Sequence, residues 1–321
     1  MRAWRALCLF VLTLFTFSSL KAERFPDAAH LLKGALKGDV NAQFMLGLAY
    51  EFGRGVAQDL VEAARWYQKA ADAGDPGAQA HLGNLYAQGR GVAQDETIAL
   101  KWYMRAAARG DSVAQTNLGC MYFSGEAGLK RDYGEAVRWF TKAAAQHNPL
   151  AEANLATLYF EGWGLPRDSE KAANLYLDAA RQGNPYSQTR LAWIYEHGIG
   201  RRQDFAESLK WDRAASQLGY PQALNNLAYH YEHGLGVLRN LPEAGKLYCR
   251  AASAGLPEAQ HNWTVIRSTL KEIPDDCDEA ARWLTKVAPQ GFGNTTESVE
   301  ASPKVRVGRS ITPDALVSEK D

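Results

Sequence analysis

The amino-acid sequence predicts an all-α protein, a solenoid of helix–turn–helix repeats. The first observation is a glycine that recurs about every 36 residues, with His147 in its place once (Gly38, Gly74, Gly110, Gly183, Gly219, Gly255). The second is the pattern between these glycines, A-Q-x-x-L-G-x-x-Y-x-x-G-x-G-V-x-x-D-x-x-x-A-x-x-W-Y-x-x-A-A-x-x-G. A fixed period of this size is typical of stacked units that contact only their neighbours.

The first repeat predicts two helices joined by a turn of about six residues. Apolar and small residues follow a helical spacing through 40–52, and Gly53 is suited to end that helix in a left-handed conformation. Asp59 is placed to cap a second helix, which carries Trp66 and Tyr67 on its apolar stripe. Each repeat is therefore a hairpin of helix A, a turn and helix B.

Six full copies follow one another, and positions within each are counted from its first residue (38–73, 74–109, 110–146, 147–182, 183–218, 219–254). A degenerate seventh copy and C-terminal cap occupy 255–288, because terminal repeats expose one face to water. Residues 23–37 can form an N-terminal capping helix. Residues 289–321 lose the helical period and are rich in Gly, Ser, Thr and Pro, which predicts a disordered tail.

Residues 1–22 have the pattern of a secretory signal peptide. Arg2 and Arg5 precede an almost wholly apolar run over 6–17, and a short polar stretch ends at Ala22, the expected cleavage point. The apolar run is short for a membrane span, although a retained anchor is the alternative. We expect export to the periplasm or outside the cell, with no stable membrane insertion after cleavage.

Charge and cysteine content narrow the function classes. The formal net charge is zero, and removing the three basic residues of the signal from 36 leaves 33 basic against 36 acidic residues, a net of −3. Nothing therefore favours nucleic acid as a partner. Three cysteines follow the signal, Cys120, Cys249 and Cys277. Cys249 and Cys277 lie in adjacent repeats but at different repeat positions, which argues against a disulfide between them.

The repeated residues resemble the Sel-one-like repeat (SLR), a longer-turn relative of the tetratricopeptide repeat. The resemblance covers about 250 of 321 residues, and its best copy runs from Gly74 to Gly110. It implies a right-handed α-solenoid with a concave groove lined mainly by helix A. It also implies an adaptor that assembles protein complexes. A cysteine-rich branch linked to β-lactam binding has paired cysteines within each repeat, and this sequence lacks them.

Motifs for catalysis are weak. The G-R-G-V turns at 53–56 and 89–92 lack the Lys-Ser/Thr and the preceding strand of a phosphate loop. Ser268 and Lys271 match S-x-x-K, but neither S-D-N nor K-T-G accompanies them. We therefore expect no enzyme and no cofactor. A loop serine and a solvated lysine are the simpler interpretation.

Two Glu-His pairs at the end of helix A are weak candidates for a metal site. Glu196 and His197 occupy the same repeat positions as Glu232 and His233 in the next copy. Neighbouring helices stand about 8–10 Å apart, so these carboxylates and imidazoles could converge on a metal ion. The alternative is a shared Tyr-Glu-His-Gly ending with solvated side chains.

Aromatic residues give the candidate partner-binding site. Position 11 of helix A is variable and becomes large and aromatic in the last two full repeats (Leu48, Asn84, Cys120, Thr157, Trp193, Tyr229). We expect Trp193 and Tyr229 to stack in the groove beside His230, with Trp163 bordering them. Exposed aromatic residues in a concave surface are typical binding anchors. Packing between repeats is the alternative, as we expect for the framework residue Trp66.

The sequence thus favours a non-enzymatic scaffold that binds a protein or peptide. A hydrolase of the β-lactam-binding, cysteine-rich repeat type is one alternative. A module that binds cell-envelope polysaccharide is another, since Trp and Tyr faces also suit sugar rings.

Overall fold

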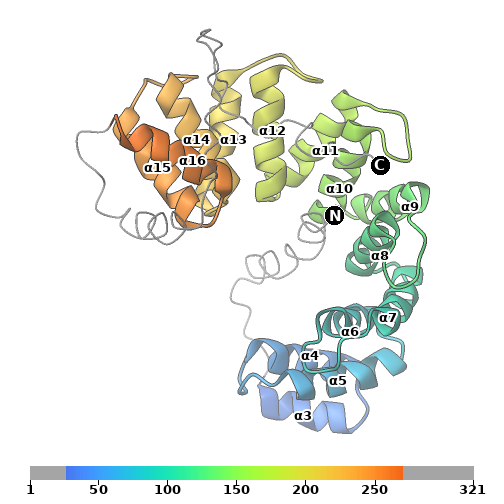
Figure 1. Ribbon diagram of the computed structural model, residues 1–321. Coiled ribbons are helices and arrows are strands. Elements are labelled where there is room, and N and C mark those ends of the chain that lie inside the picture. The colour runs from blue at the N-terminus through green and yellow to red at the C-terminus, as the bar shows by residue number, and fades with distance from the viewer. Residues whose placement is uncertain (1–26, 270–321) are drawn as a thin grey trace, which may run out of the picture. The chain divides into compact units, whose positions relative to one another are not determined.

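The protein is all-helical over residues 27–269, the range that this computed structural model describes. Helix α3 (Ala28–Leu36), inside the range 23–37 assigned to a cap, precedes six hairpins, and α16 (Pro257–Arg267) follows them (Figure 1). Helices A are α4 (Val40–Phe52), α6 (Pro76–Gln88), α8 (Ser112–Ser124), α10 (Pro149–Glu161), α12 (Pro185–His197) and α14 (Pro221–His233). Helices B are α5 (Leu60–Asp72), α7 (Glu96–Ala108), α9 (Tyr133–Ala144), α11 (Ser169–Arg181), α13 (Phe205–Gln217) and α15 (Leu241–Ser253). The predicted signal peptide and tail lie outside the described residues.

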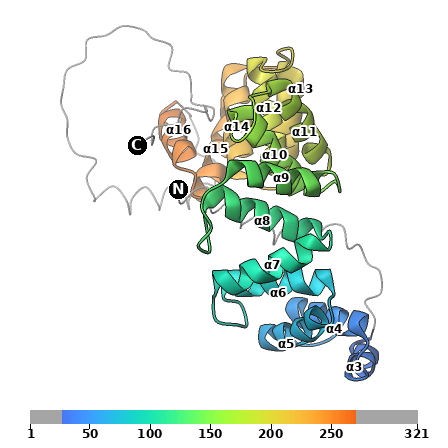
Figure 2. The ribbon, with the colours of Figure 1, turned by 90° about the vertical axis from the view of Figure 1, so that its right-hand side faces the viewer.

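The chain divides into two compact units between Leu175 and Tyr176, within α11. In the N-terminal unit each helix from α3 to α10 packs on the next, and in the C-terminal unit α12 to α16 do the same. Figures 1 and 2 both show α12, α13 and α14 side by side. Helices A of neighbouring hairpins also contact one another, as α4 does α6 and α12 does α14. Their side chains at positions 8, 11 and 14 are called the helix A surface below, and this stacking confirms the predicted α-solenoid.

Side-chain caps and glycines fix where most of the described helices begin and end. The Asp59 carboxylate accepts hydrogen bonds from the backbone N–H groups of Val61 and Glu62 at the start of α5. Gly53 ends α4 with φ of 66°, a conformation that a side chain disfavours. His147, which replaces the opening glycine of the fourth repeat, has φ of 57° and thus adopts the left-handed conformation of its glycine counterparts.

In five repeats a glutamine at position 6 joins the first helix of the repeat to the helix before it. The Gln79 side-chain amide donates to the Ala71 carbonyl at 3.0 Å, and that carbonyl also accepts from the N–H of Gly74. The same contact recurs in four other repeats (Gln43, Gln115, Gln188, Gln260). The last carbonyls of a helix have no partner within it, so this glutamine satisfies a helix end.

Position 10 of helix A allows close packing against helix B. A Cβ atom on Gly83 would lie 2.7 Å from the ring of Tyr103, and Gly47 faces the ring of Tyr67 in the same way. The glycines of the L-G pair therefore make room for the aromatic residue at position 30, which is fully or almost fully buried in both hairpins.

The two described cysteines differ in bonding state. Cys120 is buried and outside any disulfide, whereas Cys249 is buried and disulfide-bonded. The disulfide partner of Cys249 lies outside the described residues, as does Cys277. The absence of a disulfide between Cys249 and Cys277 therefore stays a prediction. None of the helices described over residues 27–269 is both long and apolar enough to cross a membrane.

Candidate functional site

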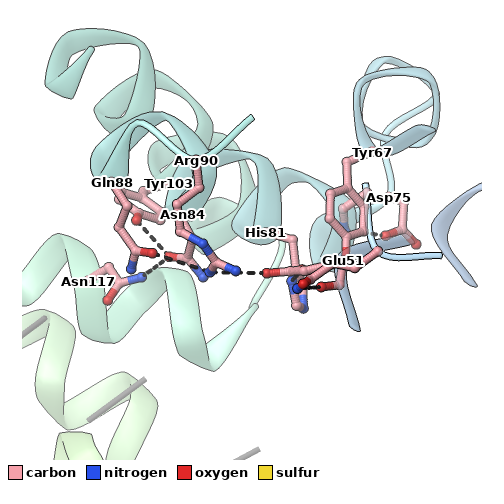
Figure 3. Close-up of polar contacts among 11 residues, drawn as sticks. Glu51, Tyr67, Asp75, His81, Asn84, Gln88, Arg90, Tyr103 and Asn117 are labelled. Atoms are coloured by element: carbon pink, nitrogen blue, oxygen red, sulfur yellow. Dashed lines mark hydrogen bonds and ion pairs between the residues drawn. The ribbon is translucent and has the colours of Figure 1, made fainter. Parts of the chain in front are cut away.

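A buried carboxylate, Glu51 at position 14 of the first repeat, organises the helix A surface of the N-terminal unit. It accepts a hydrogen bond from the Tyr67 hydroxyl at 2.7 Å, and His81 Nδ1 lies 3.0 Å from the same oxygen (Figure 3). The Arg90 guanidinium lies 3.5 Å from the other oxygen. Burial raises the pKa of Glu51, but the hydrogen bonds and charges of His81, Tyr67 and Arg90 outweigh it and the pKa is lowered. The carboxylate is thus held in its charged form.

Amide side chains continue this surface into the next repeats. The Asn84 side-chain oxygen accepts hydrogen bonds from the Tyr103 hydroxyl at 2.7 Å and from Asn117 at 2.9 Å (Figure 3). The Asn154 amide in turn lies 3.8 Å from the sulfur of Cys120. Positions 8 and 11 of successive helices A therefore form a row of fixed polar groups.

The C-terminal unit has a buried polar cluster between α13 and α14. His230 Nε2 lies 3.2 Å from the Ser208 hydroxyl and 3.6 Å from Asp212, while Nδ1 lies 2.9 Å from the carbonyl of Leu235. Because that carbonyl can only accept, Nδ1 carries the proton. Asn226 also donates to Asp212, at 3.4 Å.

Burial sets the charge balance of this cluster. Burial raises the pKa of Asp212 to about 6, although His230 and Asn226 lower it. Burial lowers the pKa of His230, but the Asp212 carboxylate outweighs this and the pKa is raised. Ser208 and His230 are 0% exposed, and Ser and Asp approach the same ring nitrogen. In a hydrolytic triad the carboxylate holds the opposite nitrogen, so the geometry of this cluster differs from that of a triad.

The predicted anchor residues Trp193 and Tyr229 differ in how far they are buried. Trp193 is only 5% exposed and stacks on His197, with ring centroids 4.5 Å apart. Tyr229 is half-buried and packs on His233 at 4.0 Å. The expected exposure of Trp193 and closeness of His230 to the surface are therefore wrong, because His230 at position 12 faces the core. Partner binding at these residues stays a prediction.

Trp163 lies in the N-terminal unit, in the turn after α10. Its ring stacks on Tyr133 with centroids 5.8 Å apart and planes at 15°, and Phe123 lies 5.6 Å away. All three residues are half-buried, so this aromatic cluster keeps some accessible surface.

The metal and nucleophile candidates have local partners. His197 Nδ1 and His233 Nδ1 contact backbone carbonyls of their own helices, at 3.0 and 3.1 Å. Glu232 accepts a hydrogen bond from the Tyr248 hydroxyl. Within residues 27–269 no group of three His, Cys, Asp or Glu side chains is placed to hold a metal ion. The Ser268 hydroxyl bonds to the carbonyl of Val265, and Lys271 lies outside the described residues.

Neither Glu51 nor Asp212 was predicted from the sequence as a site residue. Position 30 is aromatic in most repeats, as in Tyr67 and Tyr248. The aspartate at this position in the fifth repeat, Asp212, is therefore the sequence feature that indicates an unusual polar site. A comparison of helix B residues with their helix A partners would have found both.

These features define a class of protein: an all-α array of tandem hairpins with a regular packing framework and variable side chains on its helix A surface. The Sel1 repeat profile matches six consecutive segments (40–75, 76–111, 112–148, 149–184, 185–220, 221–256). The chain therefore belongs to the Sel1 repeat family, whose members generally mediate protein–protein interactions.

Two solved structures are similar to this chain. One is a protective antigen present in uropathogenic Escherichia coli strains that displays an SLR fold, 34% identical with a TM-score of 0.68. The match covers 82% of this chain but 56% of the antigen, so this chain spans little more than half of that protein. The other is a Sel1 repeat protein from Oxalobacter formigenes, 31% identical with a TM-score of 0.64, covering 71% of this chain and 98% of that one. No curated protein sequence matches this chain.

Proposed function

We propose that this protein is a non-enzymatic scaffold that binds a protein or peptide along its helix A surface. The observation that carries the proposal is the variation at position 11, where the packing framework stays regular while the side chain differs in all six repeats (Leu48, Asn84, Cys120, Thr157, Trp193, Tyr229). Residues that serve only the stacking of repeats have no need to vary in this way. The interactions that Sel1 repeat proteins generally mediate support this proposal.

We also propose that the scaffold works in the cell envelope or outside the cell. The basic and apolar pattern of residues 1–22 supports export. Fractionation of cells that express the full chain should place it outside the cytoplasm, whereas a chain lacking residues 1–22 should stay inside. Equal distribution of the two chains would contradict export.

The binding proposal is tested by affinity capture from envelope extract. The Tyr229→Ala variant removes a half-buried ring from the helix A surface. The control Leu238→Ala removes a side chain that is 89% exposed in a turn of the same unit. Quantitative mass spectrometry should show partners that the wild type and the control retain and the Tyr229→Ala variant loses. If all three proteins retain the same partners, binding at Tyr229 is refuted.

A further inference from the structure

Three repeats have a glutamate at position 14, and the chain gives them unequal partners. They are Glu51, Glu196 and Glu232. Glu51 obtains a hydrogen bond from position 30 of its own repeat, Tyr67. It obtains two basic groups from positions 8 and 17 of the following repeat, His81 and Arg90 (Figure 3).

Glu196 has none of these three partners. Its own repeat has Asp212 in the place of Tyr67, and the next repeat has Asn226 and Leu235 in the places of His81 and Arg90. Asp212 is engaged by His230 and Asn226 instead. Within residues 27–269 the half-buried Glu196 carboxylate makes no hydrogen bond or ion pair.

The surroundings of Glu196 are anionic and aromatic. Burial raises the pKa of the neighbouring Tyr229, and the charges of Glu196 and Glu232 raise it further. Glu232 is also half-buried, with its side chain 28% exposed. The imidazole of His197 lies on the backbone of its own helix, and that of His230 lies beside Asp212. The imidazole of His233 packs on one side of the Tyr229 ring, with Nδ1 on the Tyr229 carbonyl and 4.0 Å from Glu232. No basic side chain of the described chain therefore fills the place that Arg90 fills beside Glu51.

A cation has two sources of attraction at this place. A guanidinium binds a carboxylate through charge-assisted hydrogen bonds, and it is also attracted to the face of a tyrosine ring. Arginine is preferred over lysine in such a setting because its planar group can do both at once. The Arg90–Glu51 pair is an example, within this chain, of a guanidinium held at position 14.

We propose that Glu196 and Tyr229 form a binding site for an arginine side chain of the peptide or protein partner. The ligand's guanidinium takes the place, relative to Glu196, that Arg90 takes relative to Glu51, and Glu232 adds a second negative charge. The inference rests on the proposed function, since it specifies the chemistry of a partner on the helix A surface. It assigns the C-terminal unit a preference for basic peptides.

The test measures binding of a fluorescein-labelled peptide, Ala-Arg-Ala-Ala-Arg-Ala, by fluorescence polarisation. A second peptide has citrulline, a neutral isostere, in place of both arginines. The Glu196→Gln variant removes the charge and keeps the shape of the side chain. The control Glu207→Gln removes a carboxylate of the same unit that pairs with Lys210 on the exposed side of α13. Circular dichroism verifies that each variant is folded.

The wild type and Glu207→Gln should bind the arginine peptide equally, and Glu196→Gln should weaken binding about tenfold, as loss of a charge-assisted hydrogen bond predicts. The citrulline peptide should bind at least about tenfold more weakly than the arginine peptide. Equal binding of the two peptides, or unchanged binding by Glu196→Gln, would overturn the site.

A second variant introduces the missing cation as a side chain of the protein itself. Leu235 occupies the position of Arg90, so Leu235→Arg should place a guanidinium on Glu196 and exclude the peptide. Unchanged peptide binding by this variant would refute the equivalence with Arg90. Envelope partners that are lost with Tyr229→Ala but retained by Glu196→Gln would overturn the arginine site while the scaffold proposal stands.

Discussion

The Asp212 carboxyl group makes the free energy of unfolding depend on pH. Burial raises its pKa to about 6, against 3.8 for the ordinary carboxyl. Between these values the native state keeps a proton that the unfolded state releases, so stability falls as pH rises. The two values differ by about 2, and each pKa unit corresponds to about 1.4 kcal/mol, so the loss amounts to about 3 kcal/mol once the pH exceeds about 6.

His230 also makes the free energy of unfolding fall as pH rises. The pKa of His230 is raised, because the Asp212 carboxylate outweighs the effect of burial. Its contribution is fully present below pH 6.5, its ordinary pKa, and is lost as pH rises through the raised value. The other groups that face the pair are Ser208, Asn226 and the carbonyl of Leu235, together with the charge of Glu196.

The assay compares urea unfolding of the wild type and Asp212→Asn from about pH 4 to about pH 7.5, followed by circular dichroism. Asparagine keeps the shape and removes the titrating carboxyl and the raised pKa of His230. The wild type should lose at least about 3 kcal/mol relative to the variant over this range, because the effect of His230 adds to that of Asp212. For the control Glu207→Gln, the free energy of unfolding should change with pH as it does for the wild type. Parallel profiles for Asp212→Asn and the wild type would refute the reasoning.

Three further substitutions, with Gly134→Ala as a control, test the packing framework by the same unfolding assay. Gly83→Ala should destabilise by about 1–3 kcal/mol because its Cβ would overlap the Tyr103 ring, whereas Gly134→Ala, which meets only the Asp132 carboxylate, should be neutral or stabilising. Asp95→Ala should cost about 1 kcal/mol, since the carboxylate caps two N–H groups of α7. Gln79→Ala should cost about 1 kcal/mol through the lost hydrogen bond to the preceding helix. A cost below about 0.3 kcal/mol for either of the last two would contradict the role given to that side chain.

Most of the fold could be predicted because residues within each repeat determine where its helices begin and end. Gly53 and Asp59 mark the turn between α4 and α5 through backbone conformation and capping, which are local effects that a sequence displays. The left-handed conformation of His147 follows from its place in the glycine series. The period then fixes which helix packs on which.

The candidate site was harder to predict because its chemistry depends on partners one repeat away. Trp193 at a variable position was expected to be exposed, but the neighbouring structure leaves it 5% accessible. Residues at the same repeat position also differ in charge environment, as Glu51 and Glu196 do, and only the spatial neighbours reveal this. The sequence alone does not show which of these residues contact one another.

The glutamine at position 6 has a consequence for how the chain can be shortened. Because Gln79 bonds to the end of the preceding helix B, a hydrogen bond crosses the boundary between two sequence repeats. A truncation placed after Ala73 would leave the Ala71 carbonyl without its glutamine, although the cut would respect the sequence period. A truncation placed in the turn after Gly89 would keep this bond, at the cost of parting α6 from α7. Shortened chains of equal length should therefore differ in stability according to which half of a hairpin they end with.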